Sequence, residues 1–357
     1  MTSTEFQRLP DRRLCVAPMM AHTDRHFRYL LRLISSRVML YSEMLTTGAL
    51  LNGEPSRRLA FDAAEHPVGL QVGGADPVAL ARCARIAESA GYDEVNLNVG
   101  CPSDRVRSGR FGACLMAEPG LVAECAAAML AAVRIPISVK SRIGIDGRES
   151  YDDLARFIDT VAGTGCRIFI VHARKAVLGG LSPRQNREVP PLRHEFVHRL
   201  KRDFPDLEII VNGGIRSLEG ARDQLAYVDG AMIGRAACDN PYLLADADRE
   251  IFGLGTPAAS RREVLERFID YMETRLASGD TLQAMTRHLL GLFQGQPGAR
   301  SFRRHLSQHA RASAAGIAII REALELAAGA RHSLHSAGCQ PAVLPIHPAA
   351  SRRDGTC

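Results

Sequence analysis

The residue with the clearest chemical potential is a cysteine that follows a predicted strand. Residues 95–99 alternate between apolar side chains and asparagine, and a period of two is typical of a β-strand. Gly100 and Pro102 then end the strand. The sequence therefore places Cys101 on a tight turn just beyond a strand end.

A cysteine on such a turn has three chemical uses. A metal site would need further ligands at suitable spacing, and no C-x-x-C or histidine pair lies nearby, so no metal is expected. A nucleophile would need a histidine base from elsewhere in the fold. A proton donor needs only a positioned thiol. The remaining alternative is a small buried residue that closes the turn.

The elements that position this turn follow a regular alternation of strands and helices. The predicted strands are 14–19, 38–43, 68–72, 94–99, 137–140, 168–172, 208–212 and 231–234. The clearest helices are 77–89, 119–133, 152–162 and 218–225. Such a pattern is typical of a (β/α)8 TIM barrel. A doubly wound sheet is the alternative, but it normally has a glycine-rich fingerprint after strand one, where this chain has Pro18-Met19-Met20.

Polar residues lie at or just beyond the ends of these strands. They are Gln71, Asn98, Cys101, Lys140, His172 and Asn212. In a barrel the carboxyl ends of all strands meet on one face. We therefore expect these six side chains to form one active site.

The last two strands predict an anion site. Asn212-Gly213-Gly214 and Gly234-Arg235 follow them, and glycines let backbone amides approach an anion closely. Loops after strands seven and eight form the common phosphate site of TIM barrels. Lys140 adds a positive charge at the same face.

Two long insertions follow strands of the barrel. Residues 103–116 resemble a flap over the cysteine turn, and packing is the favoured role for Cys114 within it. Residues 173–191 contain Arg174, Lys175, Arg184 and Arg187. A long basic loop beside an active site indicates contact with a polyanion, and a structural loop with solvated charges is the alternative.

The C-terminal third differs from the barrel in charge. The chain of 357 residues has a net charge of +6, and residues 256–357 hold 13 Arg, no Lys and 8 acidic residues, which accounts for +5 of it. We predict a barrel domain at 1–255, a helical domain at 256–330 and a disordered tail at 331–357. The helical domain should contain helices at 261–277, 282–292, 299–311 and 317–328.

Composition excludes other classes. Apolar residues make up 46% and charged residues 24% of the chain, as in globular proteins. No apolar run is long enough for a membrane span, and no signal peptide is evident. Nine scattered cysteines indicate reduced thiols and a cytoplasmic protein.

The motifs together resemble the tRNA-dihydrouridine synthases. They are Ala17-Pro-Met-Met20, Gln71-Val-Gly-Gly74, Asn96-Leu-Asn-Val-Gly-Cys-Pro102, Val139-Lys-Ser-Arg142, His172-Ala-Arg174, Asn212-Gly-Gly214 and Ile233-Gly-Arg235. Residues 179–187 and 109–116 look like the bacterial A subfamily, which is associated with uridines 20 and 20a of the tRNA D-loop. The resemblance covers residues 12 to about 325 and implies an FMN-binding barrel, a helical tRNA-binding domain and NADPH (or NADH) as electron donor.

The resemblance also implies roles for single residues. Pro18, Met19 and Met20 border the flavin, Gln71, Lys140 and His172 contact its isoalloxazine ring, and Asn212, Gly213, Gly214, Gly234 and Arg235 hold its phosphate. Cys101 is the implied proton donor, and Asn98 meets the uracil. Arg184, Arg187, Arg300 and Arg303 match tRNA-contact positions. The tail after Ala328 departs from the family pattern.

These roles define a reaction and its alternatives. Hydride would add to C6 of uracil, and Cys101 would protonate C5 as a general acid. The target uridine must leave its stack to reach the barrel mouth. We expect a monomer whose partner is tRNA. The alternatives are an FMN-dependent reductase or dehydrogenase of free pyrimidines (dihydroorotate-type), which needs no basic helical domain, and a non-catalytic RNA-binding barrel.

Overall fold

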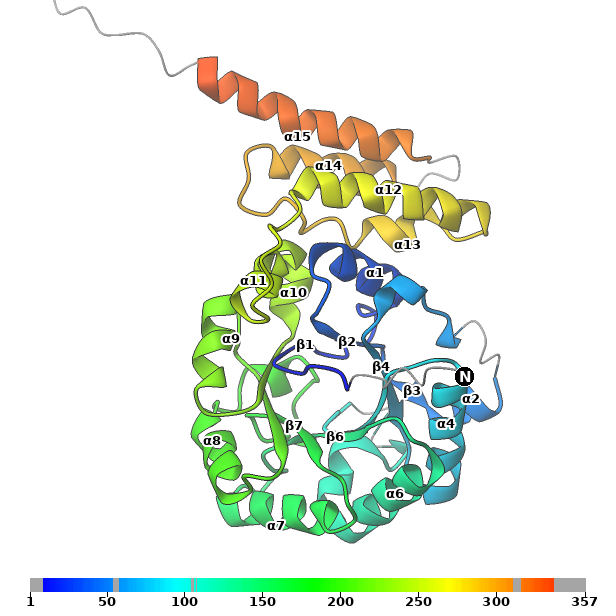
Figure 1. Cartoon of the computed structure of the whole chain (residues 1–357), viewed down its shortest axis with the longest axis vertical. Coiled ribbons are helices and arrows are strands. Elements are labelled where there is room, and N and C mark those ends of the chain that lie inside the picture. Colours follow the sequence, from blue (N-terminus) through cyan, green and yellow to red (C-terminus); the bar gives the residue numbers. More distant parts are fainter. Residues whose placement is uncertain (1–8, 54–57, 104–105, 107, 311–315, 337–357) are drawn as a thin grey trace, which may run out of the picture. The chain divides into compact units, whose positions relative to one another are not determined.

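The computed structural model of the chain describes residues 9–53, 58–103, 106, 108–310 and 316–336 (Figure 1). The predicted disordered tail from 337 onward lies outside these residues. The chain divides into two compact units, residues 1–294 and 295–357. This division differs from the predicted domain boundary at 255/256, because helix α1 (Arg25–Ile34) packs against helices α12 (Arg261–Ala277) and α13 (Leu282–Thr286) within the first unit.

The first unit is built on a closed barrel of eight parallel strands, as predicted from the sequence. They are β1 (Leu14–Val16), β2 (Met39–Tyr41), β4 (Val68–Gly73), β5 (Glu94–Val99), β6 (Ile137–Arg142), β7 (Ile168–His172), β8 (Glu208–Asn212) and β9 (Gly230–Ile233). Pairing of β1 with β9 and of β2 with β4 closes the ring. A short strand, β3 (Leu45–Thr46), pairs with β4 outside this count and was not expected.

Helices surround the barrel (Figure 1). They are α2 (Thr47–Leu51), α4 (Pro77–Ser89), α6 (Pro119–Ala132), α7 (Tyr151–Ala162), α8 (His194–Asp203), α9 (Leu218–Leu225), α10 (Arg235–Asp239) and α11 (Ala247–Glu250), with 3-10 turns η1 (Ala63–Glu65), η2 (Gly112–Ala117), η3 (Gln185–Arg187) and η4 (Pro241–Leu244). Local signals fix their starts. Asp76 caps α4 by accepting from the amide of Ala79, and Pro77 suits its first position.

Strand β5 shows how the barrel separates its two faces. Its six residues are all buried. Val95, Leu97 and Val99 alternate with Glu94, Asn96 and Asn98, whose side chains bond to residues of other strands inside the barrel. Because side chains alternate across a strand, the apolar set turns outward towards the helices. The asparagines of β5 therefore line the barrel interior.

The helices after the barrel follow the prediction in part. Helix α12 has the predicted bounds. Helix α13 ends at Thr286, short of the predicted 292, since the following segment forms turns in which Arg287 and His288 pair with Asp24. A Cβ at Gly291 would clash with the carbonyl oxygen of Asp239, so the close approach of these two backbone segments requires glycine.

The second unit contains α14 (Ala299–His309) and α15 (Ala318–Ser336), which pack on each other. Helix α15 continues through residues 331–336, so the predicted disorder was wrong for this stretch. In the part of the chain that the structure describes, no helix is both long and apolar enough to cross a bilayer.

Candidate active site

The turn after β5 presents Cys101 through backbone hydrogen bonds. The amides of Gly100 and Cys101 donate to Asn98 Oδ1 at 3.1 and 3.0 Å. The Cys101 carbonyl accepts from the amide of Ala113 at 3.0 Å, which ties the turn to the flap. Its thiol is partly exposed and lies 3.4 Å from Ser103 Oγ. The cysteine is therefore held on a fixed turn with an accessible sulfur, as general acid chemistry requires.

A row of amide side chains supports this turn from inside the barrel. Asn98 Nδ2 donates to Gln71 Oε1 at 2.9 Å, and Gln71 Nε2 donates to Asn96 Oδ1 at 2.7 Å. Asn96 Nδ2 in turn donates to Ser138 Oγ at 2.7 Å. Each bond fixes the orientation of the next amide. Gln71 and Asn98 thus lie side by side with defined donors and acceptors.

Two basic groups of the same face are Lys140, which is partly buried, and His172, which is buried. Lys140 Nζ donates to Asn212 Oδ1 at 3.1 Å, and Asn212 Nδ2 donates to the carbonyl of Met232 at 2.8 Å. Burial, with help from the charge of Arg142, lowers the pKa of Lys140 to about 7. Burial and the same arginine hold the pKa of His172 well below its usual range. A bound anion would favour the charged form of Lys140, because it would supply the missing counter-charge.

Glycines after β8 leave room for a close approach to the backbone. Gly213 and Gly214 adopt φ angles of 110° and 75°, a region that L side chains rarely enter. A Cβ at Gly213 would lie 2.5 Å from Cδ2 of His172. The carbonyl of Gly213 bonds to His194 Nε2 at 2.7 Å, so it is already engaged. This turn is a backbone cradle that only glycine can form.

Gly234 and Arg235 follow β9 at the start of α10. Arg235 forms an ion pair with Glu188 at 2.5 Å, and both side chains are about half exposed. Glu188 also lies 3.6 Å from Arg184. Exposed ion pairs contribute only ~0–1 kcal/mol. A phosphate group can therefore displace Glu188 from Arg235 at little cost.

The segment after β1 contains the three residues expected to border a flavin. Met19 packs against the barrel core, Pro18 is partly buried and Met20 is 56% exposed. Buried Thr23 accepts from the Met19 amide at 2.9 Å and donates to its carbonyl at 3.2 Å. The loop is thus fixed, while Met20 remains available for a ligand.

The arginines expected to contact tRNA lie in both units. Arg184 and Arg187 flank the 3-10 turn η3 in the insertion after β7, and both are exposed. Arg300 and Arg303 are exposed on α14 of the second unit, three residues apart on one helical face. Cys101 interacts electrostatically with Arg187 and with Lys140, so the insertion and the cysteine turn are neighbours.

Two residues of the site received no role from the sequence. Arg142 donates from Nε to the carbonyl of Gly100 at 3.1 Å, and Asn96 orients Gln71. A signal for both exists in the sequence, because residues two apart in a strand share a face. Arg142 lies two residues after Lys140 in β6, and Asn96 lies two residues before Asn98 in β5. Each is therefore expected on the same face of its strand as the residue that was predicted.

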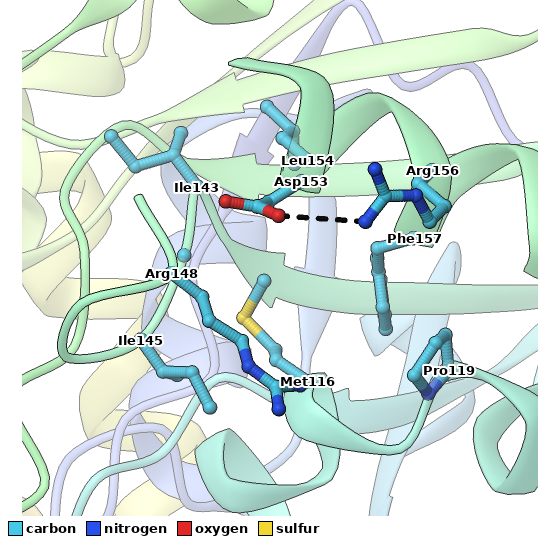
Figure 2. A pocket seen from close by; sticks show the side chains of 10 residues that line it. Met116, Pro119, Ile143, Ile145, Arg148, Asp153, Leu154, Arg156 and Phe157 are labelled. Atoms are coloured by element: carbon cyan, nitrogen blue, oxygen red, sulfur yellow. Dashed lines mark ion pairs between the residues drawn. The ribbon is translucent and has the colours of Figure 1, made fainter. Parts of the chain in front are cut away.

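A small pocket opens elsewhere on the barrel (Figure 2). It lies between η2, the loop after β6 and α7, with Met116, Ile145 and Phe157 in its lining and the Asp153–Arg156 ion pair at 3.6 Å on its rim. No residue predicted to act on substrate or cofactor lines it.

Comparison with known proteins agrees with this geometry. The family model "Dihydrouridine synthase (Dus)" matches residues 15–328. A tRNA-dihydrouridine(20/20a) synthase of Vibrio cholerae is 56% identical over 87% of this chain and 95% of its own length. Enzymes of the same name from Shewanella oneidensis (55% identity; 88% of this chain, 94% of theirs) and Pseudomonas aeruginosa (56%; 89% and 96%) are similar.

A solved 2-naphthoyl-CoA reductase complex is similar in fold alone. Its TM-score is 0.50 at 13% identity, over 66% of this chain and 49% of the reductase. The family match and the relatives cover nearly the whole described chain, including the cysteine turn, Lys140 and the glycine cradle. On this ground the chain belongs to the dihydrouridine synthase family.

Proposed function

We propose that this protein reduces uridine to 5,6-dihydrouridine at positions 20 and 20a of the tRNA D-loop, with FMN as cofactor and NADPH as electron donor. The observation that carries the proposal is that Asn98, whose side chain holds the amide of Cys101, is paired in register with Lys140 of the next strand, in a chain that matches the family over residues 15–328. We also propose that it acts as a monomer in the cytoplasm, where tRNA is available.

The residues at the barrel mouth fit a flavin mononucleotide. The Gly213–Gly214 turn offers backbone amides in a cradle that a Cβ would fill, and Arg235 adds a cation that only an exposed ion pair engages. These groups, with Asn212 and Gly234, would hold the phosphate. Gln71, Lys140 and His172 would face the ring system, and Pro18, Met19 and Met20 would border it.

Side chains of the protein would supply the proton, hold the uracil and stabilise the negative charge. When bound and reduced, FMN supplies the hydride that C6 of uracil accepts. Cys101 then gives a proton to C5, since hydride addition places negative charge there and on the C4 oxygen. Asn98 holds the cysteine turn through two amides and is the proposed contact for the uracil. Protonated Lys140 would stabilise negative charge on the ring beside it.

Recognition of tRNA would come from arginines outside the barrel strands. Arg187 interacts electrostatically with Cys101, Arg184 belongs to the same insertion, and Arg300 and Arg303 add an exposed basic helix face. We assign the helical domain 256–330 to tRNA binding on this basis. Guanidinium groups pair well with phosphates, and an extruded uridine needs the surrounding backbone to be held.

The proposal is tested by spectroscopy on the purified protein. We expect a yellow protein with the absorbance of FMN. NADPH should bleach this absorbance, and NADH should do so more slowly. Unmodified tRNA should then reoxidise the flavin in the absence of oxygen. Reoxidation by free uracil or orotate in place of tRNA would support a free-pyrimidine enzyme. A colourless protein that binds tRNA would support a non-catalytic RNA-binding barrel.

A further inference from the structure

Arg142 is a buried arginine that, among the described residues, donates to three backbone carbonyls. It is the last residue of β6 and is 4% exposed. Nε donates to the carbonyl of Gly100 at 3.1 Å, and Nη1 donates to those of Lys175 at 3.2 Å and Asn186 at 2.8 Å. One of these acceptors lies in the cysteine turn and the other two lie in the insertion of residues 173–191, so one side chain joins the turn to the insertion.

The first acceptor sets the position of the proton donor. Gly100 directly precedes Cys101, and its amide is held by Asn98 Oδ1. A Cβ at Gly100 would lie 3.3 Å from the backbone of Ser141, so the turn packs closely on β6. The carbonyl of Gly100 and the amide of Cys101 form one peptide unit, which Arg142 holds at its oxygen and Asn98 Oδ1 holds at its N–H. The direction in which Cys101 leaves the strand depends on these bonds.

The other two acceptors set the shape of the basic insertion. Asn186 is fully buried, and its side chain accepts from the Val177 amide at 2.7 Å and donates to the carbonyls of Val177 and Leu181 at 2.9 and 3.2 Å. The insertion thus folds around Asn186, and Arg142 holds the carbonyl of that residue. Arg187 is the next residue along the chain.

The chemistry of arginine suits this position. Its planar group presents several donors in fixed directions, whereas a lysine ammonium is a single point charge on a flexible stem. Within the part of the chain that the structure describes, no carboxylate pairs with Arg142. The bonds it makes among these residues all fix backbone geometry.

We propose that Arg142 is a positioning residue that couples the tRNA-contact loop to the proton donor. Through Asn186 it holds the loop that carries Arg184 and Arg187, and through Gly100 it holds the turn that carries Cys101. Binding of tRNA to the loop and delivery of the proton to C5 then share one anchor. This inference rests on the proposed function and adds a residue to it.

The first test is Arg142→Lys, which keeps the charge and loses the fixed set of donors. Rates of flavin reoxidation at saturating tRNA should fall about 10²-fold, since a displacement of about 1 Å has an effect of that size. The tRNA dissociation constant should rise about tenfold. FMN content and NADPH oxidation should match wild type, which also shows that the variant is folded.

Arg148→Lys is the matched control. Arg148 lies in the loop after β6 and also donates to a backbone carbonyl, that of Ala117 at 3.0 Å, but it is exposed on the pocket of Figure 2. It touches neither the Cys101 turn nor the insertion of residues 173–191. We expect wild-type rate and affinity from this variant. An equal loss in both variants would mean that any arginine of this region matters, and the proposal would fail.

A double-mutant cycle separates positioning of Cys101 from a general structural effect. In the Cys101→Ala background, Arg142→Lys should leave the residual reoxidation rate unchanged, while its effect on tRNA affinity persists. A further 10²-fold loss of rate in that background would show that Arg142 does not act through Cys101.

The loop is tested separately by Asn186→Asp. This change keeps the acceptor for Val177 and removes the two donated bonds, so tRNA affinity should fall with the rate at saturating tRNA little changed. It also keeps the proposal testable if Arg142→Lys does not fold. Wild-type affinity for Asn186→Asp would overturn the loop anchor. Failure of the wild-type protein to reoxidise with tRNA would instead overturn the proposed function.

Discussion

The two ends of the barrel interior differ in whether their buried cations are paired with carboxylates. At the amino ends of the strands, Arg12 pairs with Glu94 at 2.6 Å and with Glu208 at 3.1 Å. At the carboxyl ends, partly buried Lys140 donates to the amide oxygen of Asn212, and buried Arg142 donates to the carbonyl of Gly100. Among the described residues no carboxylate pairs with either. At the amino ends the buried cation faces carboxylates, whereas at the carboxyl ends Arg142 keeps its charge without one among these residues.

This difference shows which end of the barrel has a ligand to bind. A buried charge without a counter-ion is costly, so its retention indicates a partner that arrives later. At the amino ends the chain supplies both members of each pair, which makes that end structural. At the carboxyl ends the missing anions match a phosphorylated cofactor and an RNA substrate.

The largest effect should come from Cys101→Ala at the carboxyl end. General acids contribute ~10²–10⁴-fold to rate, and we expect a loss of this size in uridine reduction at saturating tRNA. FMN content and tRNA affinity should be retained, because the side chain is small. Single-turnover reoxidation measures the rate. Turnover near that of wild type would remove Cys101 from the mechanism.

A change at the amino end should affect stability and leave catalysis unchanged. Glu94→Gln removes the carboxylate nearest to buried Arg12, and breaking such a pair costs about 3 kcal/mol. Urea unfolding of the holoprotein measures it. Asp11→Asn is the matched control, since Asp11 pairs with the half-exposed Arg13 at 2.7 Å and should contribute less than about 1 kcal/mol. If Glu94→Gln were as stable as Asp11→Asn, a structural role for the ion pairs at the amino ends would be contradicted.

The arginines outside the strands should contribute through phosphates. Substitution of Arg184, Arg187, Arg300 and Arg303 by alanine should weaken tRNA binding. Each lost contact should reduce the slope of log K against log salt by somewhat less than ~1. NADPH oxidation should not change. Titration of tRNA at several salt concentrations measures both quantities.

Arg82 and Arg85 provide a control for that series. They are exposed on α4 and are three residues apart, the same spacing as Arg300 and Arg303. Their removal lowers net charge without touching the predicted contacts, so affinity should fall only slightly. Equal losses from both pairs would mean that net charge alone attracts the RNA.

The smallest effect concerns a single proton at Lys140. Burial lowers its pKa to about 7 in the protein, so above pH 7 the amine is mostly neutral. A bound anionic flavin would raise that pKa, so FMN binding to apoprotein at pH 8 should take up nearly one proton, and affinity should fall as pH rises through 7. Calorimetry in two buffers of different ionisation enthalpy measures the uptake. The proton uptake should vanish in the Lys140→Met variant. It should persist in the control variant Lys201→Met, because Lys201 already pairs with Asp229.

The sequence predicts the barrel well because its signals are local. The alternation in residues 95–99 and the caps at Asp76 and Pro77 depend on nearest neighbours, and the strands and helices follow them closely. Helix α13 is shorter than predicted because distant partners decide its end: Arg287 and His288 pair with Asp24. Periodicity carries no information about such a contact.

The site shows the same division. The strand-end positions of Lys140 and His172 follow from topology, since a barrel brings its carboxyl ends together. The role of Arg142 depends on which carbonyls its guanidinium reaches, and these lie in two loops far apart in sequence. Loop paths are set by many weak contacts. Motif spacing therefore identifies Arg142 as part of a motif but does not predict which backbone groups it binds.

The most direct test of the account is the product made from tRNA. Anaerobic enzyme, reduced with one equivalent of NADPH, is mixed with an unmodified tRNA transcript, and the D-loop fragment is analysed by mass spectrometry. We predict a gain of two hydrogens per reduced uridine, confined to positions 20 and 20a, and we predict that the Cys101→Ala variant does not produce this gain. An unchanged transcript from flavin-loaded, reducible enzyme would contradict it, as would reduction spread over uridines elsewhere in the molecule.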